Sequence, residues 1–370
     1  MKILLVTPPY HCGVVESAGR WMPLGLFTLA GALRDAGHDV EVYDAMTLFH
    51  TQEDVARTIA TRAPDVVAVT TITATAPASL EVLRAAKRVA PRTVTVMGGV
   101  HGTFLWQEVL GAPDSPVDYV VRGEGEETLP ELLACLGAGG DPARVAGVAC
   151  RQDGVPVSAP LRPLLADLEA HPPAWDLVNW DDYTYFPFPG SRLAIVSSSR
   201  GCVFGCSFCS QQKFWNRSWR PRRPEAVVAE LEHLRDAYRV DVALLADEYP
   251  TPDQERWKRL LDLLRARRLG TRLLMETRVE DIVRDAELMP DYRSAGIIHV
   301  YVGVEATSQA ALDRFNKSLR VEQSREALRL IHGVGMVSET SFVLGMPEET
   351  PATIRATLEL AKDYDPDFAH

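Results

Sequence analysis

Apolar strands alternate with helices along two long stretches of this chain, and this alternation restricts the possible folds more than any other feature of the sequence. In the first stretch, strands are predicted at residues 2–7, 39–43, 64–71, 93–97 and 117–121. Helices are predicted at residues 24–36, 54–62, 77–90 and 127–136. Units in which a helix follows each strand place their strands parallel in one sheet, with helices on its faces. Residues 1–150 are therefore predicted to form a doubly wound, Rossmann-like α/β domain.

The second stretch repeats the alternation from Leu193 onward. Strands are predicted at residues 193–198, 242–246, 271–276, 297–304 and 338–344. Helices are predicted at residues 224–238, 253–268, 285–295, 321–334 and 350–363. Residues 367–370 resemble the start of a sixth strand, so we expect the barrel to need sequence past His370. Residues 193–370 are predicted to form a partial (β/α)6 barrel, with its chemistry at the C-terminal ends of the strands.

A connector, residues 151–192, separates the two stretches and differs from both in composition. It is rich in proline and aromatic residues, most densely in HPPAWDLVNWDDYTYFPFPG. An exposed linker with this composition would leave much apolar surface in water. We therefore predict that the connector packs between the domains.

The overall composition excludes several classes of protein. Lys and Arg total 39 against 50 Asp and Glu, a net charge of −11, whereas nucleic-acid binding needs a basic surface. No run of 18 uncharged apolar residues is present, so no membrane span is expected. The N-terminus MKILLVTPPY is typical of a buried strand and not of a signal peptide, so a cytoplasmic protein is expected. The 6 cysteines are too sparse for a disulfide scaffold.

The most specific motif is a C-x3-C-x2-C run, in which Cys202, Cys206 and Cys209 follow a predicted strand. Three thiolates on one loop can bind three irons of a four-iron four-sulfur (4Fe-4S) cluster and leave the fourth iron open, whereas electron-transfer clusters use four cysteines. Zinc is the alternative, but structural zinc sites need four ligands. No further Cys or His lies near in sequence, and His233 falls on a predicted helix. The remaining cysteines, Cys12, Cys135 and Cys150, are scattered and are not expected to bind the cluster.

A C-x3-C-x2-C loop after the first strand of a partial (β/α)6 barrel resembles the radical S-adenosylmethionine (SAM) enzymes. The resemblance implies that the open iron binds the amino and carboxylate groups of SAM, and that one electron releases a 5′-deoxyadenosyl radical. It also implies roles in binding SAM for Asp247, Glu248, Glu276, Arg278, Glu305 and Gly345. Asp247 and Glu248 stand where the family has a Gly-Gly-Glu element. The stretch FVLGMPEET, with Gly345 and Glu348, resembles the family's adenine-side element, with Ser341 in place of its first glycine.

These charged side chains also stand out without the resemblance. Each is predicted at the C-terminal end of a barrel strand, where burial is costly unless the group pairs with a ligand. The alternative for any one of them is a ring of salt bridges at the barrel mouth.

The first domain resembles the cobalamin-binding module often joined to radical SAM enzymes. The resemblance rests on three loops after predicted strands: Thr70, Thr71 and Thr73; Gly98, Gly99 and His101; and Gly123, Glu124, Gly125 and Glu126. Glycines let backbone approach a bulky ligand closely. The alternatives are plain strand-to-helix turns, or another nucleotide, although G-x-G-x-x-G is absent after the first strand.

The cobalt-ligating pattern Asp-x-His-x-x-Gly of such modules is not matched, because Met46 stands where Asp44 would require a histidine. Cobalamin is therefore predicted to bind without a histidine from this loop. His101 is the histidine most expected to face the corrin, with a hydrogen-bonded loop histidine as the alternative; His11 and His50 are other sources of a ligand.

Longer stretches, among them MGGVHGTF, SRGCVFGCSFCSQQKFW and AGIIHVYVGVEA, resemble the anaerobic magnesium-protoporphyrin IX monomethyl ester cyclases of bacteriochlorophyll synthesis. This resemblance implies an oxidative cyclisation of a tetrapyrrole, with cobalamin, SAM and a 4Fe-4S cluster as cofactors and a flavodoxin or ferredoxin as reductant. A cobalamin-dependent radical SAM methyltransferase would share every motif. A non-catalytic cobalamin or redox sensor is disfavoured, because the full set of SAM positions is present. If both cofactors act on one substrate, the loops at 98–101 and 123–126 must face the cysteine loop across one cavity, with Glu276 and Glu305 on its barrel side.

Overall fold

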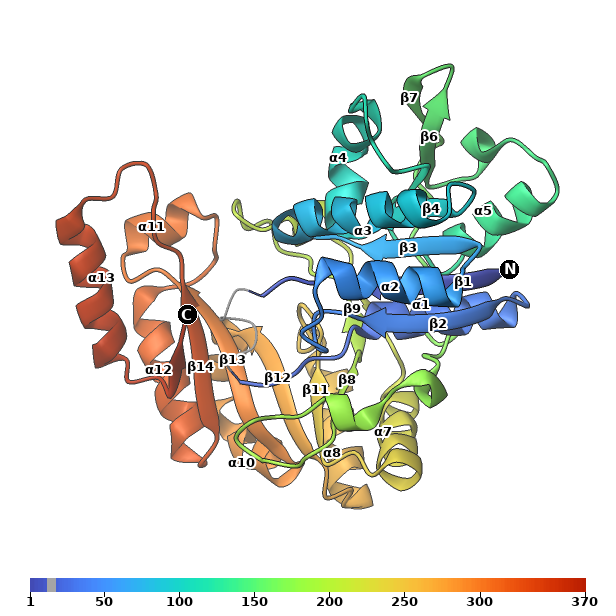
Figure 1. The fold of residues 1–370 in the computed structure, drawn as a ribbon. Coiled ribbons are helices and arrows are strands. Elements are labelled where there is room, and N and C mark those ends of the chain that lie inside the picture. The colour runs from blue at the N-terminus through green and yellow to red at the C-terminus, as the bar shows by residue number, and fades with distance from the viewer. Residues whose placement is uncertain (12–17) are drawn as a thin grey trace. The chain divides into compact units, whose positions relative to one another are not determined.

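The computed structural model describes residues 1–11 and 18–370, so Cys12 lies outside the described residues. The chain divides into two compact units, Met1–Pro187 and Phe188–His370. The prolines and aromatic residues of 159–187 belong to the first unit, where the Trp175 and Trp180 rings lie 5.9 Å apart. Packing of this segment between domains stays a prediction. Figure 1 shows both units.

The first unit is built on a sheet of 7 strands in the order β2-β1-β3-β4-β5-β6-β7. The strands are β1 (Lys2–Thr7), β2 (Asp39–Asp44), β3 (Val66–Thr70), β4 (Val94–Gly98), β5 (Tyr119–Val121), β6 (Val148–Gln152) and β7 (Val155–Ser158). Strands β1 to β5 are parallel, and β6 and β7 add an antiparallel hairpin at one edge. The doubly wound domain is confirmed. The sequence interpretation missed the hairpin, although Asp153-Gly154 is a typical hairpin turn.

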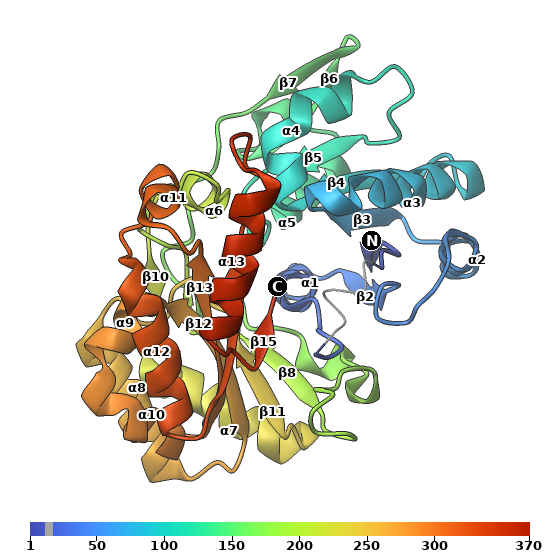
Figure 2. The same cartoon turned by 90° about the vertical axis from the view of Figure 1, so that its left-hand side faces the viewer.

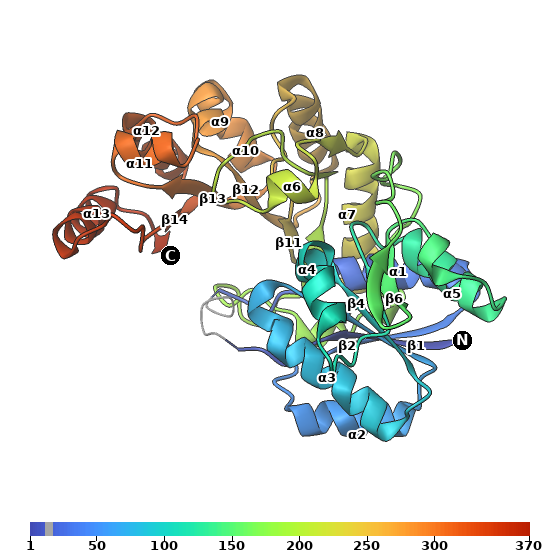
Figure 3. The ribbon, with the colours of Figure 1, turned by 90° about the horizontal axis from the view of Figure 1, so that it is seen from above.

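Helices cover both faces of this sheet: α1 (Leu24–Asp35), α2 (Gln52–Arg62), α3 (Ala76–Val89), α4 (Gly99–Gly111) and α5 (Thr128–Gly137). Apolar residues of α2, α3 and α4 form one buried cluster with the sheet, and those of α1 and α5 form a second. Figure 3 shows α2 and α3 on one side of the sheet and α1 and α5 on the other. Helix α4 was not predicted, because two glycines in its first turn hide its helical pattern.

The second unit contains a sheet of 6 parallel strands in the order β15-β14-β13-β12-β11-β8. The strands are β8 (Leu193–Val196), β11 (Val242–Leu245), β12 (Arg272–Arg278), β13 (Ile297–Glu305), β14 (Val337–Phe342) and β15 (Phe368–Ala369). The edge strands β8 and β15 do not pair with each other, so the barrel is open. Figure 2 shows the C-terminal part of the chain, where α13 (Pro351–Asp363) precedes β15. The predicted partial (β/α)6 barrel is confirmed.

The helices of this unit are α6 (Gln211–Phe214), α7 (Pro224–Tyr238), α8 (Gln254–Arg267), α9 (Val279–Arg284), α10 (Met289–Ser294), α11 (Gln309–Arg314), α12 (Val321–Gly333) and α13 (Pro351–Asp363). Short strands β9 (Ser199–Arg200) and β10 (Arg220–Pro221) pair antiparallel. The sequence interpretation missed α6, α9 and α11, which have only 4 to 6 residues and so show little periodicity. Within the described part of the chain, no helix combines the length and apolar character needed to cross a membrane.

Strand register decides which side chains line the inner face of the barrel. Glu276 on β12 pairs with Tyr301 on β13, which pairs with Glu339 on β14. Paired residues of parallel strands point to the same side, and their chain neighbours point to the other. The neighbours Met275 and Val300 are fully buried on the helix-covered side. The inner face therefore carries Glu276, Tyr301 and Glu339, which are polar and partly exposed.

Candidate active site

The cysteine loop of the second unit is closed at its base by the β9–β10 pair, which joins Ser199 to Pro221 and Arg200 to Arg220. Residues 201–219 therefore leave and re-enter the barrel at one point. The far side of the loop is held by α11 and the turn after it. The Ser207 N–H donates to the Phe315 carbonyl (2.8 Å), and the Asn316 amide donates to the Gly205 carbonyl (2.8 Å). These bonds fix the backbone between Cys202, Cys206 and Cys209.

Glycine is required at the start of the cysteine loop. Gly201 has φ +96°, and a Cβ atom there would lie 2.2 Å from the Ser218 carbonyl oxygen. Both the left-handed backbone and the contact with fixed backbone exclude a side chain.

We predict that Gly201→Ala prevents cluster assembly. Gly335→Ala is the matched control, because Gly335 also has a positive φ, +71°, but a Cβ there meets no atom within 4 Å. The control should keep its iron and lose only about 1 kcal/mol of stability. Iron content and visible absorption after anaerobic reconstitution measure the difference. Equal iron in both variants would show that the close contact does not matter.

The three cysteine thiols are free, with Cys206 buried and Cys202 and Cys209 half-buried. Arg278, at the end of β12, lies behind them: its Nη1 is 3.9 Å from Sγ of Cys206, and its guanidinium lies 3.6 Å from the Phe204 ring centroid. Burial raises the pKa of the Cys202 thiol, while the Phe204 backbone N–H and Arg278 act against that rise. A fixed cation beside the sulfurs favours thiolates, the form that binds iron. The structure thus brings the predicted residue Arg278 to the cysteines.

Among residues 1–11 and 18–370, no three His, Cys, Asp or Glu side chains converge closely enough to bind one metal ion. A single zinc ion needs such convergence, because all its ligands meet at one atom. In a 4Fe-4S cluster each thiolate binds a different iron atom, so the sulfurs stand apart. The three thiols on one braced loop, with a cation beside them, could each bind a different iron atom of such a cluster.

Asp247 and Glu248, which follow β11, hold the backbone of the cysteine loop. Asp247 is fully buried and accepts hydrogen bonds from the Ser198 N–H (3.1 Å) and the Ser199 hydroxyl (2.7 Å). Burial raises its pKa to about 6. Glu248 accepts from the Gly201 N–H (3.0 Å) and from the Trp215 indole (2.8 Å). Both carboxylates therefore position the loop, and contact of either with SAM stays a prediction.

Glu276 differs from these carboxylates, because it points to the inner face of the barrel and is only partly buried. Desolvation, followed by the nearby charges of Glu248, Asp247 and Glu339, raises its pKa to about 8. At neutral pH this side chain is therefore largely a neutral acid that can donate a hydrogen bond. Strongly shifted acids in a cleft are typical of functional sites.

We predict that Glu276→Gln changes how stability depends on pH. A carboxyl whose folded pKa is raised binds more protons in the folded state, so it lowers stability as pH rises from its unfolded pKa of about 4.3 toward 8. The variant should therefore lose less stability than the parent between pH 5 and pH 8. Denaturant unfolding across this range measures the difference, and parallel curves would contradict the raised pKa.

Glu305 ends β13 in a buried ion pair that the sequence did not reveal. Its Oε1 lies 2.8 Å from Nζ of Lys317, which also donates to the Gly303 carbonyl (2.7 Å). Its Oε2 accepts from the Ser341 hydroxyl (3.3 Å), which in turn accepts from the Tyr301 hydroxyl (2.6 Å). The backbone of Glu305 is left-handed, with φ +65°, an uncommon conformation for a residue other than glycine. The ion pair holds this carboxylate at the barrel mouth.

The stretch after β14 is a tight turn around Gly345, which has φ +94°. The backbone N–H groups of Gly345 and Met346 donate to Oε2 of Glu349, at 2.5 and 2.8 Å. Glu348, the residue predicted from the family element, instead pairs with Arg314. A role of Gly345 beside the adenine stays a prediction.

A second polar group on the inner face, His299, Glu339 and His370, was missed by the sequence interpretation. Nε2 of His299 lies 2.9 Å from one Glu339 oxygen, and Nε2 of His370 lies 2.5 Å from the other. Burial acts to raise the pKa of Glu339, but the two histidines hold it below its ordinary value. The one signal in the sequence for this group is that His299 and Glu339 lie in two consecutive predicted strands.

In the first unit, the predicted loops follow the C-terminal ends of the neighbouring strands β3, β4 and β5. Thr70 pairs directly with Gly98, and the Thr71 N–H donates to the Gly98 carbonyl (3.0 Å). Gly99 has φ +87°, and a Cβ there would lie 2.6 Å from the Thr71 carbonyl oxygen, so only glycine fits. The strand order reverses between β1 and β3, and ligands of such sheets bind at the carboxyl ends next to that point.

Thr71 is buried within the unit, whereas Thr73 and His101 are accessible to solvent. Thr71 is buried, and its hydroxyl donates to the Ser79 hydroxyl (3.0 Å), so it supports the loop. Thr73 is exposed, with Oγ1 3.4 Å from Nδ1 of His101. Desolvation lowers the pKa of His101, which favours the neutral imidazole that can bind a metal. The structure brings Thr73 and His101 together, and binding of cobalamin by either residue stays a prediction.

The third loop is joined to the second through Thr103. The Gly123 N–H donates to the Thr103 hydroxyl (2.9 Å), which donates to the Gly99 carbonyl (2.8 Å). Glu124 accepts from the Leu165 N–H (2.8 Å). Gly125 faces Leu29, 3.4 Å from the position of a Cβ, and Glu126 is buried. Gly123 is therefore part of the loop edge, whereas Glu124 is bonded to the backbone of the segment after β7.

The Asp44 loop follows β2, and its carboxylate is already used within the unit. Asp44 is buried and accepts from the Tyr183 hydroxyl (3.1 Å) and the Thr47 N–H (3.3 Å). Nδ1 of His50 lies 2.5 Å from the Tyr43 hydroxyl, and the His11 ring stacks on Phe49. Binding of cobalamin without a histidine from the Asp44 loop stays a prediction.

The family to which the chain belongs follows from these two units. The B12 binding domain family matches residues 10–133, and the Radical SAM superfamily matches residues 196–361. The chain therefore belongs to the radical SAM enzymes that carry an N-terminal cobalamin-binding domain. Its cofactors are cobalamin, SAM and a 4Fe-4S cluster.

Among known proteins, the anaerobic magnesium-protoporphyrin IX monomethyl ester cyclases of Rubrivivax gelatinosus and Cereibacter sphaeroides are 40% and 39% identical to the whole of this chain. The chain spans 67% and 61% of their lengths. An uncharacterized methyltransferase of Pyrococcus horikoshii is 32% identical over the whole chain, which spans 79% of it. The solved radical SAM methyltransferase TsrM from Kitasatospora setae has the same fold, with a TM-score of 0.77 and 21% identity over 100% of this chain and 71% of its own.

Proposed function

We propose that the chain activates a C–H bond of a tetrapyrrole and that its reaction is the oxidative cyclisation of magnesium-protoporphyrin IX monomethyl ester or a related porphyrin. The observation that carries this proposal is the 40% identity, over the whole of this chain, to a protein named as that cyclase. This identity supports the class of reaction more strongly than it supports the porphyrin substrate, because the chain spans only part of each cyclase.

When bound, the cluster supplies one electron that splits SAM into methionine and a 5′-deoxyadenosyl radical, which takes a hydrogen atom from the substrate. The residues of this chain position the reactants. The Asp247 and Glu248 carboxylates fix the cysteine loop, and Arg278 places positive charge beside it. Glu305, held by Lys317, would accept hydrogen bonds from the ribose hydroxyls. Glu276, as a neutral acid, would donate to the carboxylate of SAM.

In the first unit, the loop edge formed by Thr73, Gly98, Gly99 and His101 would bind cobalamin. The required glycine at 99 leaves the backbone bare for close approach of the corrin, and the His101 imidazole lies beside Thr73 on the same loops. A small electron-transfer protein, a flavodoxin or ferredoxin, would supply the electron.

A cobalamin-dependent methyl transfer is the second candidate. It is favoured by the 32% identity to a protein named as a methyltransferase. The residues that would bind SAM and cobalamin serve both reactions, so the substrate decides between them.

The test is an anaerobic incubation of the reconstituted chain with SAM, a reductant and magnesium-protoporphyrin IX monomethyl ester. Cyclisation would give a product with one more oxygen atom and fewer hydrogens, with the oxygen labelled when the incubation contains heavy-oxygen water. SAM would be the oxidant, because each SAM that is cleaved would take one hydrogen atom and one further electron from the porphyrin and leave as methionine and 5′-deoxyadenosine, while the remaining hydrogens leave as protons. Methyl transfer would add one carbon that carries the label of methyl-labelled SAM. Mass spectrometry separates the two outcomes. Formation of 5′-deoxyadenosine with an unchanged porphyrin would contradict the tetrapyrrole assignment but not the radical chemistry.

A further inference from the structure

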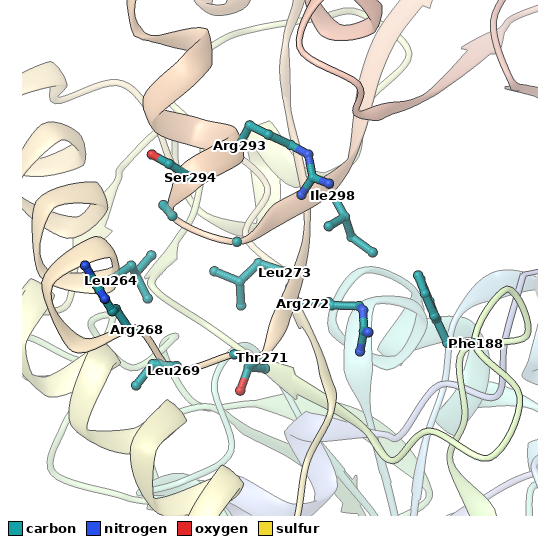
Figure 4. Close-up of a pocket in the computed structure, with 13 residues that line it drawn as sticks. Phe188, Leu264, Arg268, Leu269, Thr271, Arg272, Leu273, Arg293, Ser294 and Ile298 are labelled. Atoms are coloured by element: carbon teal, nitrogen blue, oxygen red, sulfur yellow. The ribbon is translucent and has the colours of Figure 1, made fainter.

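We propose that the second unit contains a binding site for an organic dianion at the N-terminal end of its barrel. A cavity of about 450 Å³ lies there, between the end of α8, the start of β12 and the turn from α10 to β13. Figure 4 shows its lining residues. The volume is in the range of small-molecule sites, which begin at about 300 Å³.

The cavity is separate from the candidate active site. Its lining residue Arg272 begins β12, whereas Arg278, which lies beside Cys206, ends the same strand. A strand of this length spans about 20 Å, at roughly 3.3 Å per residue. A ligand in the cavity would therefore not reach the cysteine loop, and the cavity has no part in the chemistry proposed above.

Three arginines, Arg268, Arg272 and Arg293, line the cavity, and among the described residues none of them forms an ion pair. The chain as a whole carries a net charge of −11, so this group of positive charges differs in sign from the overall charge. Three other arginines of α8 each have a carboxylate partner: Arg259 with Glu225 (3.0 Å), Arg265 with Asp291 (2.9 Å) and Arg267 with Glu232 (3.5 Å). The cavity is thus a place where guanidinium groups gather without acidic partners.

Arginines near helix C-termini can also serve to offset the helix dipole. The ends of α8 and α10 both adjoin the cavity, and each contributes roughly half a negative charge. Three guanidinium groups exceed that charge. One carbonyl at each of these helix ends is also bonded already, since the Arg268 N–H donates to the Leu264 carbonyl (3.1 Å) and the Gly296 N–H to the Arg293 carbonyl (3.2 Å). Positive charge therefore remains for a ligand.

An independent observation comes from Thr271, which lines the same cavity. The residue is 7% exposed, and its hydroxyl oxygen has no hydrogen-bond partner among the described residues. A buried hydroxyl without a partner costs free energy, so a partner from outside the chain would offset that cost.

The residues that line the cavity also indicate the chemistry of the part of the ligand between its charged groups. Leu273 lies between Arg268 on one side and Arg272 on the other (Figure 4). The Arg272 guanidinium stacks 4.4 Å from the Phe188 ring centroid, which holds its fork in place. Guanidinium forks bind carboxylate and phosphate groups through paired hydrogen bonds. A compact apolar body with anionic groups at its two ends matches this arrangement.

The test is isothermal titration of the full chain with naphthalene-2,6-dicarboxylate, 1-naphthyl phosphate and inorganic phosphate, with 2-naphthoate as the single-charge control. We expect the dicarboxylate to bind at least about tenfold more tightly than 2-naphthoate, a difference of about 1.4 kcal/mol. Stronger binding of 1-naphthyl phosphate would assign the site to organic phosphates instead of dicarboxylates. Raising the salt concentration should weaken the binding, because the arginines are exposed.

Variants decide whether binding occurs at this cavity. Arg272→Gln/Arg293→Gln should weaken dicarboxylate binding about tenfold or more, and Thr271→Val should weaken it a few-fold. Arg355→Gln on α13 is the matched control, since Arg355 is exposed and forms no ion pair among the described residues. Iron content of each variant checks that the barrel has folded. Absence of binding by every probe at millimolar concentration, equal affinity in the double variant, or inorganic phosphate binding as tightly as the organic dianions would overturn the proposal.

Discussion

Replacing Cys202, Cys206 and Cys209 together by alanine is expected to remove all of the iron and all cleavage of SAM. The three thiols lie on one loop whose backbone is fixed by the β9–β10 pair, by Asp247 and Glu248, and by the turn after α11. No other described cysteine is close in the chain, since Cys135 and Cys150 belong to the first unit. The variant should fold, because side-chain loss on this loop leaves the bracing bonds unchanged.

Iron analysis and visible absorption after anaerobic reconstitution measure this prediction, with about four irons per chain expected for the parent. Formation of 5′-deoxyadenosine from SAM measures the activity. Cys135→Ala is the control and should keep both. Iron bound at the parent level by the triple variant would show that the cluster lies elsewhere.

Replacing Lys317 by methionine is expected to destabilise the second unit by roughly 3–5 kcal/mol. The change leaves the Glu305 carboxylate, whose side chain is 11% exposed, without the ammonium group 2.8 Å away. An unpaired buried charge is much more costly than an absent pair, so the double variant Glu305→Gln/Lys317→Met should recover part of the loss.

The control for this prediction is Lys362→Met on α13. Lys362 also forms an ion pair, with Glu359 at 2.9 Å, but both side chains are more than 70% exposed. Its removal should cost less than about 1 kcal/mol, because water solvates the remaining charge. Denaturant unfolding followed by circular dichroism compares the variants. Similar losses for Lys317→Met and Lys362→Met would refute the view that burial makes the Glu305 pair important.

Most of the fold could be predicted because the central strands are recognisable one at a time. Strand β1 spans Lys2–Thr7, the range predicted from its apolar run, and β13 lies within one residue of its prediction. Strands of parallel sheets are covered on both faces, so their sequences are apolar throughout. The elements that were missed lack such a signal. Helix α11 has 6 residues, and the edge hairpin β6–β7 is partly exposed.

Only part of the candidate site could be predicted from the sequence. The spacing of the three cysteines was sufficient to indicate a cluster, since ligands on one loop are close in sequence. Lys317 could not be found in that way, because its partner Glu305 is 12 residues away and the fold brings them together. The same holds for His299 and Glu339, which meet only through the register of β13 and β14.

The fold class, the two cofactor-binding units and the cysteine motif could be inferred from the amino-acid order alone, because each depends on residue types at short and regular spacing. Which charged side chains face each other became visible only in the folded chain. Asp247 and Glu248 hold backbone, Glu276 faces the inside of the barrel, and three arginines from two connections line a cavity at its opposite end. The physical reason is that the sequence specifies which side chains can carry a charge. Its desolvation and its partners depend on the packing of elements that are distant in the chain.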